Sequence, residues 1–457
     1  MENITDILCE FAFSLKYSDF SKPTVVQTQK FIVDYFAASL AGAGVNTAFN
    51  SAVLNVARSM GGNPQASVLF EKKKYPVTEA AFINAAYAHG ADLDDGNRLS
   101  AGHIGAHVIS SVFALAEERK LCWKDVLTAI NVGYDFFNRL GAAAQPDLYN
   151  KGFHSTGVVG AVASGAACAK ALGLNKEGIY DSVSLAAIQA GGLIIIDETG
   201  QGCKPVNPAN AARIGVVSAL LAEQNISPPR NPLESGKGWF HAFSDDIKAQ
   251  YITEGLGKTF TIDESYLKLY PTCRHTHSCI DAAKAIYEHL SKERISSGNI
   301  KKIQVFIYPS AIRSAGKIET PKNCEEAKFS IKFATAVALA KGKFDIEDLN
   351  PDICSGEIKS LAGRVELEPD FSMENRAEGI RGARVKIVLS DGKVFEKIVL
   401  TPDGEGKKSL SWEILEKKLL SCAEPLEGEC QAKKVFDLCR NIDVESVFMY
   451  PAAVFAE

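Results

Sequence analysis

The spacing of apolar residues along the chain changes near residue 262 and is helical again from about residue 403 onward. Before residue 262 apolar positions recur every three to four residues, which is the period of amphipathic helices. One such run extends from Phe31 to Leu40 and stops at Gly42, and another covers residues 157–172. The second run consists largely of Gly, Ala, Ser and Cys, and such small side chains allow helices to approach closely. We therefore predict a central helix here, in a tightly packed layer.

A third helix is predicted from Asn207 to about Gln224. Asn207 is a favourable N-cap, and Pro208 is favourable at the first helical position because its missing N–H is not needed there. The segment that starts at Asn225 then ends the helix, because it contains two consecutive prolines.

Beyond residue 262 the apolar positions alternate with polar ones, which is the spacing of a strand. Ile303, Val305 and Ile307 are the clearest example. Residues 384–389 and 394–400 flank a Ser-Asp-Gly-Lys segment, a combination typical of a β-hairpin. Helices are predicted at residues 279–291, 326–341, 411–422 and 430–441.

These patterns predict a mainly α-helical protein that contains a smaller α+β region. Residues 1–262 would form the first part of a large helical domain, and residues 263–402 the α+β domain. Residues 403–457 would be C-terminal helices that rejoin the helical domain. A chain of 457 residues is long enough for domains with substantial cores.

Composition and charge exclude several classes of partner. The chain is 46% apolar and 23% charged, as is usual for a globular protein, and its formal net charge is −5. We therefore expect no nucleic acid and no membrane partner, since neither would bind an acidic surface. A negatively charged substrate would need a locally basic pocket.

The start of the chain and its cysteines bear on location. Glu2, Asp6 and Glu10 stand where a secretory signal would need basic residues and an apolar run. Eleven cysteines without a regular framework are typical of reduced thiols, and no apolar stretch approaches the roughly 20 residues that span a bilayer. A cytoplasmic protein is expected.

The candidate chemistry lies in short polar stretches that hold most of the eight histidines. Imidazole titrates closest to neutral pH, so histidines placed among acids, Lys and Arg indicate proton transfer. His103 and His107 are four residues apart, as in some zinc sites, but Ile104 replaces the glutamate of the metalloprotease pattern and no third ligand is evident. We predict no metal site.

Five motifs, in order, resemble those of the MmgE/PrpD family, which includes 2-methylcitrate dehydratase, cis-aconitate decarboxylase and iminodisuccinate epimerase. The motifs cover nearly the whole chain: Asn84 to Asp95 with His89, Asp92, Asp94, His103 and Glu117; Phe153-His154-Ser-Thr-Gly; Lys204-Pro to Gly215; Lys268 to Cys273; and Glu326-Ala-Lys-Phe-Ser330.

The resemblance implies a helical domain with an inserted α+β lid, a site in the cleft between them, and a homodimer. Known members need no metal or organic cofactor and act by acid–base chemistry beside a carboxylate. By resemblance, His103 and His154 transfer protons, while Asp92 or its neighbours orient an imidazole or bind a substrate hydroxyl. The cations Lys204 and Lys268 would hold carboxylates. Further substrate-binding candidates are Arg274, His275, His277, Asp95 and Arg98.

Simpler structural readings compete with these roles. A histidine at a helix start, such as His103 or His154, is often only a packed and hydrogen-bonded residue. The aspartates at 92, 94 and 95 could cap a helix or bind Arg98, and Lys204 could be a solvated loop residue. His107 is expected to pack or to support its neighbours.

Three positions depart from the family pattern. Ile104 follows His103 where the family usually has proline, and Gly96 stands where the decarboxylase has a hydroxyl residue. Phe333 replaces a tyrosine that could supply a proton or a hydrogen bond. A direct transfer of either the decarboxylase or the dehydratase activity is weakened by these changes.

Four functions remain open. The first is a hydro-lyase that dehydrates or hydrates a small citrate-like hydroxy-di- or tricarboxylate. The second is an epimerase of a dicarboxylate such as iminodisuccinate, and the third is a decarboxylase. The fourth, of another class, is a catalytically silent homologue that binds a carboxylate metabolite.

Overall fold

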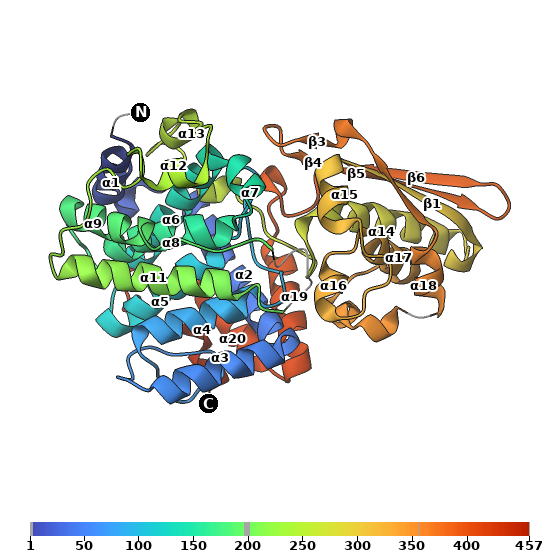
Figure 1. Ribbon diagram of the computed structural model, residues 1–457. Coiled ribbons are helices and arrows are strands. Elements are labelled where there is room, and N and C mark those ends of the chain that lie inside the picture. The colour runs from blue at the N-terminus through green and yellow to red at the C-terminus, as the bar shows by residue number, and fades with distance from the viewer. Residues whose placement is uncertain (1–2, 196–201, 355, 457) are drawn as a thin grey trace. The chain divides into compact units, whose positions relative to one another are not determined.

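The computed structural model describes residues 3–195, 202–354 and 356–456, and the chain divides into two compact units (Figure 1). The helical unit comprises residues 1–90, 94–267 and 411–457. The mixed unit comprises residues 268–410 together with the short segment 91–93. The protein is mainly helical, with a small sheet in the mixed unit, as the apolar spacing predicts.

The helical unit is a set of packed helices. Its longer helices are α1 (Ile4–Ser14), α2 (Lys22–Val45), α3 (Thr47–Met60), α4 (Val77–His89), α5 (Gly105–Arg119), α6 (Trp123–Ala144), α8 (Ser155–Ala171), α9 (Lys176–Ala187), α11 (Val206–Glu223), α19 (Trp412–Ala423) and α20 (Glu429–Arg440). Short turns of helix, α7 (Asp147–Asn150), α12 (Trp239–Phe243) and α13 (Gln250–Thr253), join them.

Helix α8 lies at the centre of this unit, where it packs against α5, α6, α9 and α11. Small residues in α8 and in its neighbours allow the helices to lie close together. A Cβ added to Gly165 would lie 2.9 Å from the Cβ of Ala186 on α9, and one added to Gly215 on α11 would lie 2.3 Å from the Cβ of Ser164. The prediction of a central, closely packed helix is confirmed.

Two helix boundaries differ from their predictions for identifiable reasons. Helix α2 continues past Gly42 to Val45, because Gly42 serves a close contact: a Cβ there would lie 1.9 Å from the carbonyl oxygen of Tyr87. Helix α11 has Pro205 as its N-cap, so Asn207 is inside the helix and the predicted cap is wrong. The amide of Asn207 is thereby available for another contact.

The mixed unit contains a four-stranded sheet in the order β2-β1-β5-β6. Strand β1 (Ile300–Ile307) pairs in parallel with β2 (Val365–Pro369) and antiparallel with β5 (Ala383–Leu389), and β6 (Val394–Val399) completes the predicted hairpin. The buried residues of β1 and β5 alternate in register, with Ile303 opposite Ile387 and Val305 opposite Val385.

Helices complete the mixed unit. Helices α14 (His277–Lys292) and α17 (Ile331–Lys341) pack on each other, and α14 also contacts β5 and β6. The helix predicted at 326–341 is interrupted, because the hydroxyl of Ser330 accepts from Phe333 N and caps α17, leaving α16 (Cys324–Lys328) separate. The remaining elements are α15 (Pro309–Ala315), α18 (Gly356–Ala362), β3 (Glu374–Asn375) and β4 (Ile380–Arg381).

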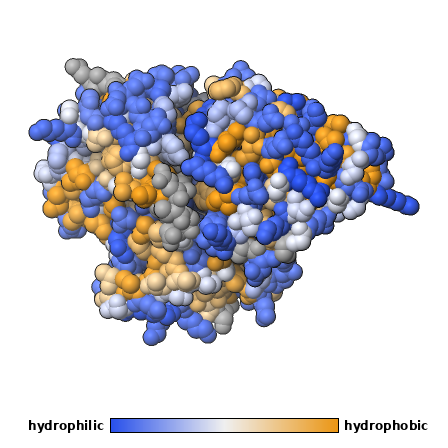
Figure 2. Space-filling view, turned by 45° about the vertical axis from the view of Figure 1, so that its right-hand side comes forward, coloured by the Kyte–Doolittle hydropathy of each residue, from blue (hydrophilic) through white to orange (hydrophobic). Residues whose placement is uncertain are grey.

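Apolar residues form clusters between polar ones on the visible surface of both units (Figure 2). The exposed large apolar side chains include Ile188, Leu193 and Ile195 in the helical unit and Val394 and Ile398 in the mixed unit. Among the described residues, no helix combines the length and apolar character needed to cross a membrane. The homodimer stays a prediction.

The C-terminal helices are joined to the first half of the helical unit by a buried ion pair, which yields a stability prediction. Lys418 on α19 donates to Asp34 on α2, and both side chains are almost fully buried. Removing one partner of a buried pair leaves an uncompensated charge. Lys418→Ala should therefore lower the free energy of unfolding by about 3 kcal/mol or more, measured by urea denaturation.

Lys433→Ala is the matched control, because Lys433 on α20 forms an exposed pair with Glu416 on α19. An exposed pair contributes about 0–1 kcal/mol, so this variant should unfold almost as the parent does. Equal losses in the two variants would contradict a structural role for the buried pair.

Candidate active site

The site is organised by the loop that joins α4 to α5, which contains backbone strain. Asp92 and Ala101 have φ values of 52° and 51°, in the left-handed region that non-glycine residues rarely adopt. Within the mixed unit, Lys268 holds Asp92 in this conformation: its Nζ donates to the Asp92 carbonyl at 2.6 Å and lies 3.2 Å from Oδ1. Strain of this kind, of order 1–3 kcal/mol, is frequent at functional sites.

Asp94 is a buried carboxylate that bridges two imidazoles. Its Oδ2 lies 2.8 Å from Nδ1 of His89, and its Oδ1 lies 3.3 Å from Nδ1 of His103. Burial alone would raise the pKa of Asp94, but the two histidines outweigh it and hold this pKa well below its usual value. Asp94 therefore stays ionised; it accepts an N–H from His89 and forms an ion-pair contact with His103.

His103 is held by hydrogen bonds to both its ring and its backbone. Its Nδ1 lies 2.8 Å from the carbonyl oxygen of Asp95, and its backbone N–H donates to Thr156 Oγ1 at 3.1 Å. A carbonyl can only accept, so Nδ1 carries the proton and the lone pair of the neutral ring is on Nε2. The side chain of His103 is 13% exposed, whereas that of His89 is fully buried.

His107 supports His103 from one helical turn further on. Its Nε2 lies 3.0 Å from the His103 carbonyl, and its Nδ1 lies 3.0 Å from Ser164 Oγ. Burial lowers the pKa of His107 to about 3, so the ring is neutral. A Cβ added to Gly160 would lie 2.8 Å from Nε2 of His107, so this glycine makes room for the ring. His107 has the supporting role expected for it.

Asp95 anchors the start of α5. Its Oδ1 accepts from the backbone N–H of Gly105 at 2.8 Å, and its Oδ2 accepts from the hydroxyl of Tyr134 at 2.6 Å. Burial raises the pKa of Asp95 to about 7, against the effect of the Tyr134 hydrogen bond. Asp95 thus accepts from the first N–H of α5, although the N-cap residue of this helix is Ile104, and Arg98 pairs with Glu264 at 3.0 Å.

His154 is the N-cap of α8 and contacts α11. Its Nδ1 lies 3.0 Å from Nδ2 of Asn207, and the same Nδ2 donates to the Leu193 carbonyl at 3.1 Å. The residues around it are fixed by a backbone bridge, in which His154 N donates to the Gly192 carbonyl at 3.0 Å. The ring centroid of His154 lies 6.1 Å from that of His89, which in turn lies 4.8 Å from that of His103.

Lys204 lies in the turn that leads into α11, and it is 9% exposed. Burial lowers the pKa of His89, and the charges of His103 and Lys204 act in the same direction, against Asp94. The positive charge of Lys204 therefore disfavours protonation of His89. The burial of Lys204 argues against a solvated loop lysine, and anion binding by Lys204 stays a prediction.

In the mixed unit, Arg274 and His277 are bound to each other. Arg274 Nη2 lies 3.0 Å from Glu405 Oε2, and Nη1 donates to His277 Nδ1 at 3.0 Å. Burial lowers the pKa of His277 well below its usual value, and Arg274 and Lys268 act in the same direction. These contacts give Arg274 and His277 a structural role within the unit, and their predicted contact with substrate stays a prediction.

His275 is surrounded by positive charge. Its Nδ1 lies 2.7 Å from the hydroxyl of Tyr308, and burial lowers its pKa well below the usual value. Four cations add to this effect, Arg381, Arg376, Lys268 and Arg313 in decreasing order. Two of these cations are themselves paired, Arg376 with Glu374 at 2.7 Å and Lys268 with Asp92 at 3.2 Å. A basic pocket for a negatively charged ligand stays a prediction.

The three departures from the family pattern have structural explanations. The backbone N–H of Ile104 lies 3.4 Å from Asp95 Oδ1, a contact that proline would lack. A Cβ added to Gly96 would lie 2.4 Å from the hydroxyl of Tyr266, so that hydroxyl occupies the space of a side chain. Phe333 is fully buried and packs edge-on to Phe344 in the mixed unit.

His89, Asp94 and His103 are also residue types that bind metal ions. Ligand atoms of His89, Asp94 and His103 lie within 4.8 Å of one another. The Nδ1 atoms of both histidines are protonated donors, however, and a metal would compete with these hydrogen bonds. The absence of a metal at these residues stays a prediction.

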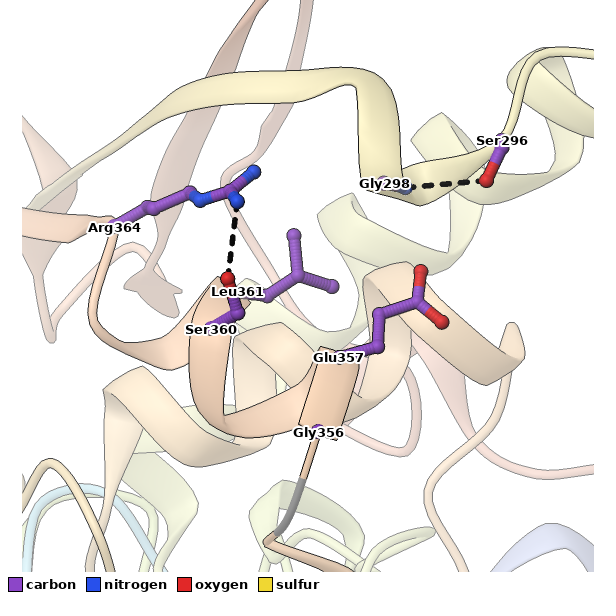
Figure 3. Close-up of a pocket in the computed structure, with 7 residues that line it drawn as sticks. All are labelled: Ser296, Gly298, Gly356, Glu357, Ser360, Leu361 and Arg364. Atoms are coloured by element: carbon purple, nitrogen blue, oxygen red, sulfur yellow. Dashed lines mark hydrogen bonds between the residues drawn. The ribbon is translucent and has the colours of Figure 1, made fainter.

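A separate pocket of about 400 Å³ lies on the surface of the mixed unit (Figure 3). In it Arg364 Nη2 donates to Ser360 Oγ at 3.0 Å, and Gly298 N donates to Ser296 Oγ at 3.2 Å. Most of its lining residues are exposed, and none is a predicted site residue. We assign it no part in the chemistry.

Comparison with known proteins bears out the resemblance. A family model of the MmgE/PrpD N-terminal domain matches residues 6–252, and one of the MmgE/PrpD C-terminal domain matches residues 270–442. The chain belongs to the MmgE/PrpD family. Within this family it is similar to enzymes that act on small carboxylates.

Three relatives illustrate the range of reactions. Cis-aconitate decarboxylase of Aspergillus terreus is 26% identical over 96% of this chain and 93% of its own length. The human cis-aconitate decarboxylase is 25% identical over 97% and 92%. The 2-methylcitrate dehydratase of Escherichia coli strain K12 is 22% identical over 72% and 68%.

Sequence reasoning singled out His103, His154 and Lys204, and it expected Asp92 or a neighbour to orient an imidazole; Asp94 is the neighbour that contacts two imidazoles. Sequence reasoning missed the residue that contacts His154. Asn207 was assigned to a helix cap, and only the fold places it beside His154.

The network predicts how stability depends on pH. Because the folded-state pKa of Asp94 is depressed, its stabilising contribution is present above the unfolded pKa of about 3.9 and is lost as the pH falls through the folded value. Asp94→Asn should therefore lower the free energy of unfolding by about 1–3 kcal/mol near pH 7. The difference from the parent should shrink as the pH falls below about 4, in urea denaturation at several pH values.

Asp125→Asn is the control, because Asp125 is an exposed carboxylate in the first turn of α6. That change should stay within about 0.5 kcal/mol. A similar loss in both variants, or a difference that does not depend on pH, would contradict the bridging role of Asp94.

Proposed function

We propose that this chain is a lyase that acts by acid–base chemistry at carbon next to a carboxylate, and that it is a hydro-lyase of a small citrate-like hydroxy acid. The observation that carries the proposal is the orientation of His103. Its Nδ1–H is bound by the Asp95 carbonyl and faces Asp94, so its basic lone pair is on Nε2 of a partly exposed ring.

In this mechanism Nε2 of His103 takes the proton from carbon. The electrons of the C–H bond become the new C=C bond, and the C–O bond breaks. The imidazolium of His103 then returns the proton to the departing hydroxide, so water leaves and the ring is neutral again. Asp94 interacts favourably with the transient positive charge, and we assign Lys204 to hold a substrate carboxylate.

Decarboxylation is the second candidate, favoured by the relatives named as decarboxylases, which match more of this chain than the dehydratase does. In that reaction the bond to a carboxylate breaks, carbon dioxide leaves, and the imidazolium of His103 protonates the remaining carbanion. The two reactions differ in the state of His103 at the start: neutral for dehydration and protonated for decarboxylation.

Proton NMR of the purified protein in D2O with 2-methylcitrate, citrate, cis-aconitate, malate, tartrate and iminodisuccinate tests the proposal. New or lost alkene signals with gain or loss of water would support the hydro-lyase. An alkene product with fewer carbons would identify the decarboxylase instead. Exchange of only the proton beside a carboxylate would indicate the epimerase, and binding without any exchange would indicate a silent homologue.

His103→Ala tests the base directly. We expect turnover to fall by about 10²–10⁴-fold, because no other group would take the proton at that position. His241→Ala is the matched control, since His241 is an exposed histidine on α12 of the same unit. A loss below tenfold in folded His103→Ala would remove this residue from the mechanism.

A further inference from the structure

We infer that Asn207 holds His154 as a neutral ring with its proton on Nε2, so that His154 donates a hydrogen bond and transfers no proton. The protonation state follows from hydrogen-bond geometry alone. Its part in the reaction rests on the proposed function.

The orientation of the Asn207 amide is decided by Leu193. Nδ2 of Asn207 lies 3.1 Å from the Leu193 carbonyl oxygen, and a carbonyl can only accept a hydrogen bond. The amide nitrogen, and not the amide oxygen, must therefore be on this side. The second N–H of the same nitrogen points at His154 Nδ1, 3.0 Å away.

This contact determines the tautomer of His154. Because Asn207 donates, Nδ1 must accept and has no proton, so the proton of the neutral ring is on Nε2. The imidazolium would place an N–H of Nδ1 against an N–H of the amide. A neutral ring whose Nδ1 lacks a proton can donate from Nε2 but is far too weak an acid to give that proton up.

Helix α8 acts in the same direction. His154 is the N-cap of this 17-residue helix, and the positive end of a helix dipole disfavours an added positive charge. The titratable groups nearby are His89 on α4 and, beyond it, Asp94 and His103, with Lys204 in the loop before α11. Asp94 is already shared by the two other histidines.

The neutral rings of His103 and His154 are therefore opposite tautomers. The neutral ring of His103 has its proton on Nδ1 and its lone pair on Nε2, whereas that of His154 has its proton on Nε2. One is suited to take a proton, and the other to stabilise negative charge that develops on a substrate oxygen. Asn207 is accordingly a positioning residue, which acts through His154.

The local fold is built to maintain this contact. A Cβ added to Gly157 would lie 2.6 Å from the Gly191 carbonyl and 3.3 Å from Cβ of Asn207. Gly192, with φ +136°, turns the chain so that Leu193 presents its carbonyl to the amide. These small residues allow the loop before residue 195 to approach both α8 and α11.

The first test observes the tautomer and needs no substrate. The protein is labelled with ¹⁵N-histidine, and the His154 signals are identified by their absence in His154→Gln. In the parent at pH 8 we expect a protonated Nε2 and an unprotonated Nδ1. In Asn207→Asp the carboxylate accepts from Nδ1, so the pattern should reverse. A protonated Nδ1 in the parent would overturn the inference whether or not a substrate is found.

The second test uses activity. If His154 only donates a hydrogen bond, His154→Gln should retain at least about tenfold more turnover than His154→Ala, since glutamine also offers an N–H. His103→Gln should show no such rescue over His103→Ala. Equal turnover of His154→Gln and His154→Ala, with both folded, would overturn the role as a donor.

The third test is the pH profile of Asn207→Asp. The new carboxylate should raise the pKa of His154 by about 1–3 units. The ring would then have a proton on Nε2 only while it is positively charged. Turnover should therefore acquire a loss at high pH that the parent lacks. Asn131→Asp is the matched control, because Asn131 is a buried asparagine of α6 that donates to Thr28 and Leu127. The same loss in the control would overturn the assignment to Asn207.

Discussion

The chemistry of this protein depends on how a buried negative charge is satisfied. A carboxylate removed from water is unstable unless it accepts hydrogen bonds from strong donors. Asp94 accepts a hydrogen bond from His89 Nδ1 and lies 3.3 Å from Nδ1 of His103, whose own acceptor is the Asp95 carbonyl. An acceptor at Nδ1 leaves the lone pair of each neutral ring on Nε2. In the mechanism proposed above, the base is this lone pair of His103, the more exposed of the two rings.

In the proposed mechanism, two histidines perform different tasks because the group at Nδ1 differs between them. An acceptor, the Asp95 carbonyl, stands at Nδ1 of His103, and a donor, the Asn207 amide, stands at Nδ1 of His154. The two tautomers of neutral imidazole differ too little in free energy to outweigh a hydrogen bond to such a partner. The roles are therefore set by groups that would not themselves touch a substrate. His107, neutral and buried, fixes the backbone of His103 in the same indirect way.

The mixed unit uses its charged residues mainly for internal order. The buried guanidinium of Arg274 contacts Glu405 and donates to His277. Lys268 holds the strained turn at Asp92. Burial and four nearby cations lower the pKa of His275, and two of these cations are paired with carboxylates. The relatives within the MmgE/PrpD family are named for reactions of cis-aconitate and 2-methylcitrate.

The amino-acid sequence by itself determined the periodic parts of this protein. The helix rich in small residues, the hairpin with its Asp-Gly turn and the alternation of Ile303, Val305 and Ile307 are local patterns, and each is present in the structure. The motif residues His103 and His154 were also identifiable. Tertiary structure alone decided the partners of those histidines, because a hydrogen bond such as that of Asn207 to His154 joins residues 53 positions apart. It also decided that Gly42 serves a helix contact and that Asn207 is no cap, since neither role is encoded by near neighbours.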